Sequence, residues 1–362
     1  MRNRTAAPRL LFFGAYDQEY PRNLVIRKGW RKLGLVYSEC RVGTRRKVHT
    51  RYPSLLYRFI RGGGRGDLIY VPEFRHKDVP LAWMISRLTG MKVLFDPLVS
   101  RYETKVLDRG DAREGSAQAW HNLNLDRISF GMSDLLLSDT AAHADYYHES
   151  FGVERAKIGV VPVGYDEDAI DALPQPQERE VIEVLFYGSF LPLHGIDTII
   201  RAAALLADEP FRFRIVGEGQ TRKGMLRMAE EHRLARVEFM PSVRFTDLGS
   251  MISEADVVLG IFGTTPKASM VGPNKVYQAL AAGRAVVTAD TPAIQEFFRD
   301  REHLMTVPRG DPEALAGLLR ELASDRSLRL RLSDVGGSYV RSHFNSRRIA
   351  ETLLGVIGEI DF

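Results

Sequence analysis

Short apolar runs alternate with longer amphipathic segments along almost the whole chain. Runs such as Leu10–Ala15 and Ala285–Ala289 are only a few residues long and almost wholly apolar, which predicts strands buried on both faces. The segments between such runs repeat apolar residues at the spacing of one helix face. Regular alternation of buried strands and helices predicts an α/β fold with parallel sheets covered by helices on both sides.

The expected elements follow directly from this alternation. We expect strands at Leu10–Ala15, Leu35–Cys40, Asp67–Val71, Lys92–Asp96, Asp134–Ser138, Lys157–Val163, Glu183–Tyr187, Phe211–Val216, Val237–Met240, Asp256–Phe262, Ala285–Ala289 and Leu304–Val307. We expect helices at Asn23–Leu33, Leu81–Thr89, Ala117–Phe130, Ala141–Phe151, Ile196–Leu206, Arg222–His232, Phe245–Glu254, Asn274–Ala282, Ile294–Phe298, Pro312–Ala323 and Ser327–His343. The polar segment Leu98–Ala117 is expected to be a long loop, and loops of that length are often functional.

One acidic segment with two prolines, Asp166–Glu180, has the composition of a linker. We therefore expect two doubly wound domains facing across a cleft, over residues 1–175 and 176–344. A helix over residues 345–362 is expected to cross back to the first domain. In such sheets ligands bind beyond the carboxyl ends of the strands, so candidate site residues are sought there.

The segment Lys267–Phe298 carries the strongest candidate site. Pro273 is suited to begin a helix and Gly283 to end it, because proline fits a first turn and glycine accepts a left-handed conformation. Lys275 and Gln278 then share one face of the first turn, beside free backbone N–H groups. A cation, an amide and these donors suit a diphosphate and its sugar, and the expected donor-binding set here is Lys267, Gly272, Asn274, Lys275 and Gln278, with Lys275 assigned a catalytic role.

Two further strand ends in the second half carry glycines. Gly188, Ser189, His194 and Gly195 follow the strand Glu183–Tyr187, where glycines let the backbone approach a ligand and His194 could donate to a phosphate. Gly217 and Glu218 follow the strand Phe211–Val216, and Glu218 could contact a ribose hydroxyl. These residues complete the expected donor site.

The first half offers a candidate acceptor site. Gly14 ends the first expected strand, and Arg22 and Asn23 begin the helix that follows. Asp96 ends another strand, where a carboxylate could act as a base or hold a sugar hydroxyl. Arg101 lies in the long polar loop. We expect Asp96 to be catalytic and the other four residues to lie on the acceptor side.

The charge is distributed unevenly along the 362 residues. The net charge is +4, but residues 1–100 contain 20 Lys and Arg against 7 Asp and Glu, so they carry +13 and the remainder carries −9. A basic lobe of this kind suits an anionic membrane surface. No zinc-finger or RNA-binding motif accompanies the charge, so nucleic acid is not an expected partner. The single cysteine, Cys40, excludes an internal disulfide and fits a reducing cytoplasm.

Metal chemistry is not expected from the sequence. The Asp166–Asp168 triplet has the pattern of a DxD metal site, but it lies in the linker rather than at a strand end beside a nucleotide site. Cysteine and histidine show no zinc-ligand spacing. We therefore expect no metal and no cofactor.

These blocks resemble a family 4 glycosyltransferase of the two-Rossmann (GT-B) type over nearly the full length. The resemblance is strongest in LFYGSFLPLHGIDTIIRAAALL, RIVGEGQ, VEFMPSV, ADVVLGIF and PNKVYQALAAGRAVVTADTPAIQE. It implies a retaining glycosyltransferase that moves a sugar from a nucleotide-diphosphate sugar to a glycan or lipid-linked acceptor, in cell-surface polysaccharide biosynthesis. It also implies a protein in the cytoplasm or on the inner face of the membrane.

The chain departs from the family pattern at two places. Met270 and Gln278 stand where the family often carries a pair of glutamates, and Ser189 and His194 stand at its usual arginine and lysine positions. These departures keep three alternatives open: a partner subunit that retains the fold without the chemistry, a nucleotide-sugar epimerase on the same fold, and a nucleic-acid binder.

Overall fold

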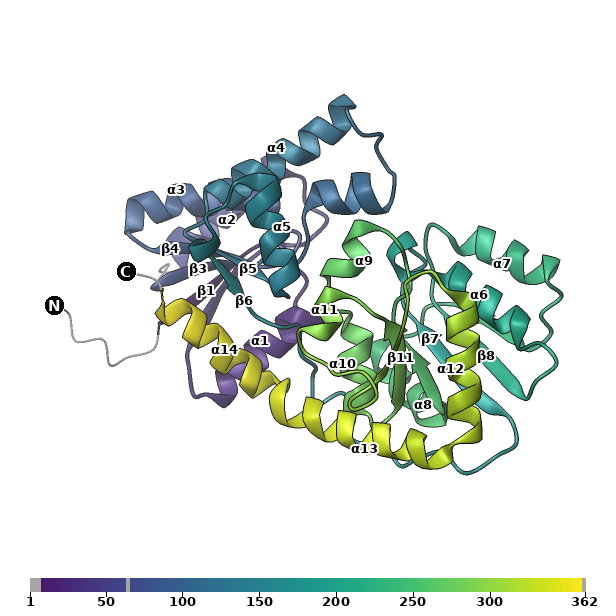
Figure 1. Cartoon of the computed structure of the whole chain (residues 1–362). Coiled ribbons are helices and arrows are strands. Elements are labelled where there is room, and N and C mark those ends of the chain that lie inside the picture. Colours follow the sequence, from purple (N-terminus) through teal and green to yellow (C-terminus); the bar gives the residue numbers. More distant parts are fainter. Residues whose placement is uncertain (1–7, 63–65, 360–362) are drawn as a thin grey trace. The chain divides into compact units, whose positions relative to one another are not determined.

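The structure is a computed structural model that describes residues 8–62 and 66–359. The chain divides into two compact units, Met1–Gly164 with Ser346–Phe362, and Tyr165–Asn345 (Figure 1). The first unit ends before the boundary at residue 175 that the linker composition suggested. The reason is that the linker is bonded to the second unit, where the Leu173 N–H donates to the Ala282 carbonyl oxygen at 3.1 Å.

The first unit is built on a parallel sheet. In its described residues six strands lie in the order β2-β1-β3-β4-β5-β6. Their bounds are β1 Leu10–Gly14, β2 Tyr37–Arg41, β3 Leu68–Val71, β4 Lys92–Phe95, β5 Leu135–Ser138 and β6 Ile158–Val160. All but β2 consist mainly of buried apolar residues, as expected for strands covered on both faces.

Helices cover both faces of this sheet. They are α1 Pro21–Lys32, α2 Val48–Arg61, α3 Val79–Thr89, α4 Ala117–Gly131, α5 Ala141–Phe151 and α14 Ser346–Gly358, with short helical turns η1 His76–Asp78, η2 Glu103–Asp108 and η3 Arg155–Lys157. Residues of α2, α3 and α5 pack with alternate strand residues in one core. On the other face α14 packs closely on α1, because a Cβ at Gly29 would lie 1.9 Å from the Ser346 carbonyl oxygen.

The second unit repeats the arrangement. In the part of the chain that the structure describes, its strands form a second six-stranded parallel sheet in the order β12-β11-β10-β7-β8-β9. The strands are β7 Ile182–Tyr187, β8 Phe211–Val216, β9 Val237–Met240, β10 Val257–Leu259, β11 Ala285–Ala289 and β12 Met305–Val307. The helices are η4 Pro192–His194, α6 Ile196–Leu205, α7 Arg222–Glu231, α8 Phe245–Glu254, α9 Pro266–Met270, α10 Asn274–Ala281, α11 Pro292–Gln295, α12 Pro312–Ser324 and α13 Arg326–His343.

The expected order of strands and helices is confirmed, with three corrections. The loop predicted for Leu98–Ala117 contains the π-helical segment η2, whose entrance is fixed by the buried carboxylate of Asp126, which accepts from the Tyr102 N–H at 2.7 Å. Helices α2 and α9 were not predicted at all. The helix predicted at Ile294–Phe298 begins earlier, because Thr291 caps the Ile294 N–H and Pro292 occupies the first turn.

Each sheet has one point where the strand order reverses. In the first sheet it lies between β1 and β3, because the chain runs from β1 to β2 on one side and from β3 to β6 on the other. In the second sheet it lies between β7 and β10. Ligands of doubly wound sheets bind at such points, beyond the carboxyl ends of the strands.

Candidate functional site

The reversal point of the second sheet is opened by glycines. Gly188 directly follows β7 and Gly217 directly follows β8, with φ of +147° and +144°, values that side chains other than glycine's rarely adopt. A Cβ at Gly217 would lie 1.9 Å from the Gly188 carbonyl oxygen. The two strand ends are therefore as close as backbone can come, and they leave exposed backbone at the edge of the sheet.

Lys275 fills the space beside Gly188. A Cβ at Gly188 would lie 2.9 Å from Lys275 Nζ, which is itself 3.9 Å from the centroid of the Phe186 ring. The side chain is buried, and its Nζ has no hydrogen-bond partner among the described residues. Burial holds the pKa of the Lys275 ammonium well below its usual value of 10.5. The site thus contains a desolvated cation that no protein group compensates.

His194 lies in the same place. Its Nδ1 contacts the Ser189 carbonyl oxygen, so this nitrogen carries the proton in the neutral ring and Nε2 is left as an acceptor. Burial, and then the nearby Lys275 and Lys267, lower the pKa of His194 well below its usual range. The hydrogen bond to a phosphate predicted for His194 therefore requires protonation, which an arriving anion would favour.

Helix α10 presents the remaining residues of the predicted segment. It begins at Asn274 and ends before Gly283, whose φ of +72° is the left-handed conformation predicted for it. The Gln278 side chain is buried, and its Oε1 accepts from the Tyr187 hydroxyl at 3.3 Å. The same hydroxyl lies 3.3 Å from the Lys275 carbonyl oxygen, so Tyr187 at the end of β7 ties this helix to the sheet.

The other predicted donor residues divide into buried and exposed groups. Lys267 on α9 and Gly272 before α10 are buried. Gly195 has φ of +60° and no room for a Cβ, which would lie 2.5 Å from the Gly263 nitrogen. Ser189 is exposed, and exposed Glu218 is 3.5 Å from Arg222 of α7. The structure thus brings Gly188, His194, Lys267 and Lys275 together, and it gives Glu218 a protein partner.

In the first unit Asp96 and Arg22 are paired with each other. Arg22 Nε lies 2.6 Å from Asp96 Oδ2, and both side chains are 1% exposed. The Tyr70 hydroxyl donates to the same carboxylate oxygen at 2.6 Å, and Arg22 Nη1 donates to the Val161 carbonyl oxygen at 2.9 Å. Burial lowers the pKa of the Arg22 guanidinium, but the attraction of Asp96 outweighs it and the pKa is raised.

This ion pair does not support the roles predicted for its members. A base or an acceptor contact needs surface that a substrate can reach, and neither side chain has it. The pair instead joins the start of α1 to the end of β4. We therefore treat Asp96 and Arg22 as structural, and the catalytic role predicted for Asp96 is not carried further.

The other predicted acceptor residues occupy different settings. Gly14 has φ of +131° and faces Asp78, which accepts from the next backbone N–H at 2.9 Å. Asn23 is buried and donates to the Asp17 carbonyl oxygen at 2.6 Å. Arg101 is half-buried, and burial lowers its pKa. Gly14 and Asn23 lie at the reversal point of the first sheet, whereas Arg101 enters the segment η2.

Glu73 is the residue that the sequence analysis missed at this reversal point. It lies just beyond the end of β3, is 2% exposed, and its Oε2 has no hydrogen-bond partner among the described residues. Burial raises its pKa to about 8, so the carboxyl group is largely neutral at pH 7. The strand-end rule that selected Asp96 would have selected Glu73 as well.

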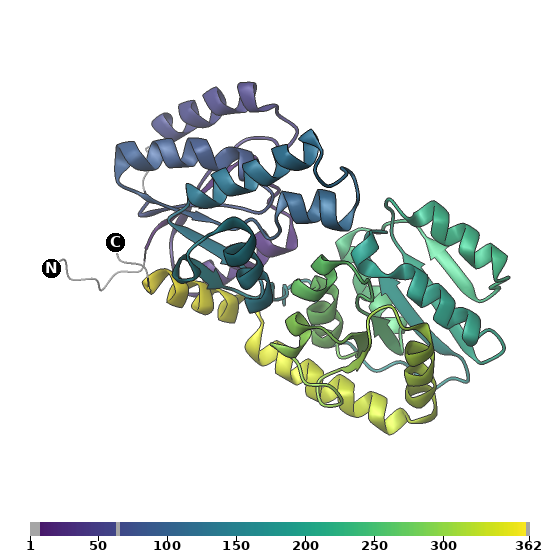
Figure 2. The ribbon, with the colours of Figure 1, turned by 45° about the horizontal axis from the view of Figure 1, so that its top comes forward.

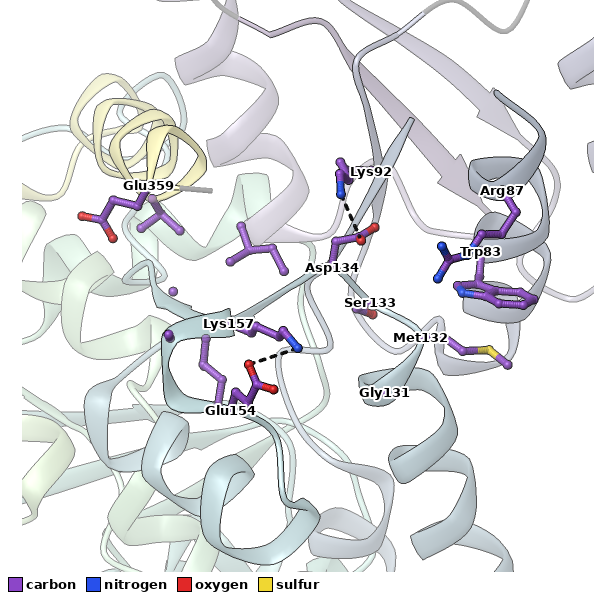
Figure 3. Close-up of a pocket in the computed structure, with 15 residues that line it drawn as sticks. Trp83, Arg87, Lys92, Gly131, Met132, Ser133, Asp134, Glu154, Lys157 and Glu359 are labelled. Carbon is purple, nitrogen blue, oxygen red and sulfur yellow. Dashed lines mark ion pairs between the residues drawn. The ribbon is translucent and has the colours of Figure 1, made fainter. Parts of the chain in front are cut away.

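A separate pocket lies at the opposite edge of the first sheet. It has a volume of about 510 Å³ and is lined by residues that precede or begin β4, β5 and β6, such as Lys92, Asp134 and Lys157 (Figure 3). Lys92 lies 3.7 Å from Asp134, and Lys157 lies 3.1 Å from Glu154. The pocket contains none of the predicted site residues, and these charges neutralise one another.

Two negative findings concern only the described residues. Within residues 8–62 and 66–359, His, Cys, Asp and Glu form no group that could hold a metal ion. Across the same ranges, no helix combines the length and apolar character that crossing a bilayer requires.

Two Rossmann-like units with glycine-rich strand ends define a GT-B fold. The structure aligns with sucrose-phosphate synthase from Thermosynechococcus elongatus at a TM-score of 0.74 and 16% identity, over 98% of this chain and 99% of that one. It aligns with Anabaena HepE in complex with UDP-glucose at a TM-score of 0.73 and 14% identity, over 98% and 100% of the two chains. The expected GT-B fold is confirmed.

The family is given by the second unit. Residues 182–325 match the family model described as glycosyl transferases group 1, so the chain carries a group 1 glycosyltransferase domain of the GT4 type. Over 127 residues it is 32% identical to WcaI of Escherichia coli K12, a protein named for colanic acid biosynthesis, covering 34% of this chain and 30% of WcaI. It is 26% identical over 278 residues to a D-inositol 3-phosphate glycosyltransferase of Corynebacterium urealyticum, covering 70% of this chain and 63% of that protein. The chain thus spans between about a third and two thirds of the length of these relatives.

Proposed function

We propose that this protein is a glycosyltransferase that moves a sugar from a nucleotide-diphosphate sugar to a glycan or lipid-linked acceptor. The observation that carries the proposal is the buried, uncompensated ammonium of Lys275 beside Gly188 at the reversal point of the second sheet. An uncompensated buried cation is unfavourable unless an anion joins it. The names of the relatives support a role in cell-surface polysaccharide biosynthesis.

In this proposal the second unit holds the donor and stabilises the leaving group. The bond between the sugar's anomeric carbon and a phosphate oxygen breaks, and a bond to the acceptor hydroxyl oxygen forms. Lys275 and the backbone N–H groups at the start of α10 stabilise the negative charge that develops on the diphosphate. The acceptor proton passes to the departing phosphate oxygen, and the sugar retains its anomeric configuration. No metal ion takes part, and no cofactor beyond the nucleotide sugar is needed.

One observation favours a second candidate, a subunit with the fold but without the chemistry. Gln278 and Met270 stand where the family often carries glutamates, and the Gln278 carbonyl oxygen already accepts from Tyr187. A subunit of this kind would bind nucleotide weakly or not at all. It would be found in a stable complex with another protein.

A thermal-shift panel tests the proposal. The protein is heated with UDP-, GDP-, ADP- and dTDP-sugars and with the free nucleotides, with EDTA present throughout. A ligand at 100 times its dissociation constant stabilises by roughly 2.7 kcal/mol, which raises the melting temperature by about 2–4 °C for a chain of this size. We expect a rise with one nucleotide family that Lys275→Ala reduces and that Lys223→Ala, at an exposed lysine of α7, does not.

The outcomes separate the candidates. A rise without metal followed by transfer to an added acceptor supports the glycosyltransferase. Turnover of the nucleotide sugar alone, with inversion at a ring carbon, would indicate the epimerase instead. A flat panel contradicts the proposal and favours the partner subunit.

A further inference from the structure

Helices α2 and α3 present large apolar side chains to solvent. Both helices cover the same face of the first sheet, and the two views show them side by side (Figures 1 and 2). The outward residues Tyr57 and Ile60 of α2 are 59% and 71% exposed, and Met84 and Leu88 of α3 are 43% and 81% exposed. We call this surface the α2–α3 face.

The inner side of α2 explains why these positions are not part of the core. Leu55 is buried, and Tyr52 and Phe59 pack against the same core. The spacing of Tyr57 and Ile60 places them on the opposite side of the helix, one turn apart. Their apolar character is therefore not required for folding, and four exposed apolar side chains on two neighbouring helices call for another explanation.

Each helix also places an arginine over an aromatic ring on this face. Arg61 lies 5.8 Å from the centroid of the Tyr57 ring and donates to its hydroxyl at 2.6 Å. Arg87 lies 5.2 Å from the centroid of the Trp83 ring. Each aromatic–arginine pair thus has an apolar body, a cationic tip and an exposed aliphatic neighbour, Ile60 in one case and Leu88 in the other. Side chains of this type favour the boundary between water and a bilayer.

The surrounding charge has a single sign. Between Glu39 and Asp67 the chain contains no acidic residue, and its Lys and Arg residues there are Arg41, Arg45, Arg46, Lys47, Arg51, Arg58, Arg61 and Arg65. Arg45, Arg46 and Lys47 lead into α2 and are exposed, as is Arg58. Arg51 is the exception, because it is buried 2.7 Å from Asp78.

We propose that the α2–α3 face docks the protein on an anionic lipid bilayer. Ile60 and Leu88 would enter the boundary between headgroups and acyl chains, and the arginines would meet lipid phosphates. Charge complementarity selects this occupant: the surface combines apolar side chains with uncompensated positive charge, which is the composition of a membrane-surface helix. A nucleic acid would use the charge but not the exposed aliphatic residues. The inference does not depend on the proposed sugar transfer, because docking needs no nucleotide.

Vesicle sedimentation tests the inference. The full chain is mixed with vesicles of phosphatidylcholine alone and with vesicles of phosphatidylcholine and phosphatidylglycerol. The variants are I60S/L88S, which removes the apolar anchors, and R58Q/R61Q, which removes two charges. The matched control is L205S/K223Q/R227Q, which changes one exposed apolar and two exposed basic residues of the second unit.

We expect the unchanged protein and the control to bind the mixed vesicles and not the neutral ones. Each charge lost should weaken binding about fivefold, so R58Q/R61Q should lose roughly twenty-five-fold, and added salt should weaken binding of the unchanged protein. I60S/L88S should also lose binding. Circular dichroism and nucleotide-induced thermal shifts should be unchanged in all variants, which separates a failure of docking from a failure of the proposed function.

Three results would overturn the inference. The first is no binding of the unchanged protein to anionic vesicles. The second is equal binding by the control and both test variants. The third is a concentration-dependent dimer that I60S/L88S abolishes while vesicle binding is absent, because the face would then join two copies of the chain. If either double variant fails to fold, the single substitution R61Q is used, with an expected fivefold loss.

Discussion

Replacing Lys275 by methionine should stabilise the protein and abolish most nucleotide binding. Methionine keeps the unbranched stem and removes only the charge and its donors. In the structure Lys275 Nζ is buried, has no hydrogen-bond partner among the described residues and lies 3.9 Å from the Phe186 ring centroid. The cation is therefore unfavourable for folding and useful only when an anion is present.

The magnitude follows from these contacts. An unsatisfied buried polar group is unfavourable by about 1–3 kcal/mol, and more when it is charged. The cation–π contact with Phe186 offsets roughly 0.5–2 kcal/mol of this. We therefore expect K275M to raise the free energy of unfolding by on the order of 1 kcal/mol. Loss of a charge-assisted bond to phosphate, about 1.5–3 kcal/mol, should weaken nucleotide binding by roughly 10- to 100-fold.

The pH dependence gives this prediction a sign. Burial lowers the pKa of Lys275 in the folded protein below its ordinary value of 10.5, so between the two pKa values the unfolded chain binds more protons. The free energy of unfolding of the wild type then rises with pH across that interval, and the penalty is fully present below the folded pKa. The advantage of K275M over the wild type should therefore shrink as the pH approaches 10.5.

Urea unfolding and calorimetric titration of nucleotide provide the assay. K223M, at an exposed lysine of the same unit, is the control and should change the free energy of unfolding by less than about 0.5 kcal/mol. If K275M lowered the free energy of unfolding and left nucleotide affinity unchanged, Lys275 would be a structural residue and the reasoning would be refuted.

Three further predictions concern single contacts. D96N leaves Arg22 buried without a charged partner, so it should lower the free energy of unfolding in urea by about 3–5 kcal/mol; nucleotide affinity should not change, and an unchanged unfolding curve would contradict the ion pair. G217A forces a Cβ against the Gly188 carbonyl oxygen and should destabilise by more than about 1 kcal/mol with weaker nucleotide binding, whereas G224A inside α7, with open space around it, should stabilise by about 0.5–1 kcal/mol; equal effects in thermal unfolding would speak against the close approach. Burial raises the pKa of Glu73 from 4.5 to about 8, so the folded state binds more protons in that interval and the wild type should lose stability relative to E73Q as the pH rises from 4.5 to 8; a pH-independent difference in urea unfolding would exclude a buried neutral carboxyl.

The fold was predictable because its information is local. Apolar runs marked the strands, and the turn chemistry of Pro273 and Gly283 placed α10 almost to the residue. Helix α2 was missed because Pro53 lies inside it and a glycine-rich segment follows it, and both features are typical of loops. The segment η2 was missed because Asp126 and His143, which hold it, are far away in the sequence.

The candidate site was only partly predictable, because pairing between distant residues leaves no local signal. Lys275, His194 and Gly188 were selected separately, and the structure brings them together. Arg22 and Asp96 were also selected separately, as groups for a substrate, yet 74 positions apart in the sequence they neutralise each other. A strand-end carboxylate looks the same in sequence whether it meets a sugar or an arginine.

The return of α14 to the first unit has a consequence for synthesis and for fragment design. The second unit is one continuous stretch, Tyr165–Asn345, whereas the first unit needs Ser346–Gly358 to cover α1. On the ribosome the second unit can therefore complete its core before the first one can, against the usual order in which domains fold from the N-terminus. Cutting the chain after Gly164 would expose the side of α1 that meets Ser346 and Ala350. A soluble first unit would instead require α14 to be supplied separately, or joined to residue 164 by a circular rearrangement.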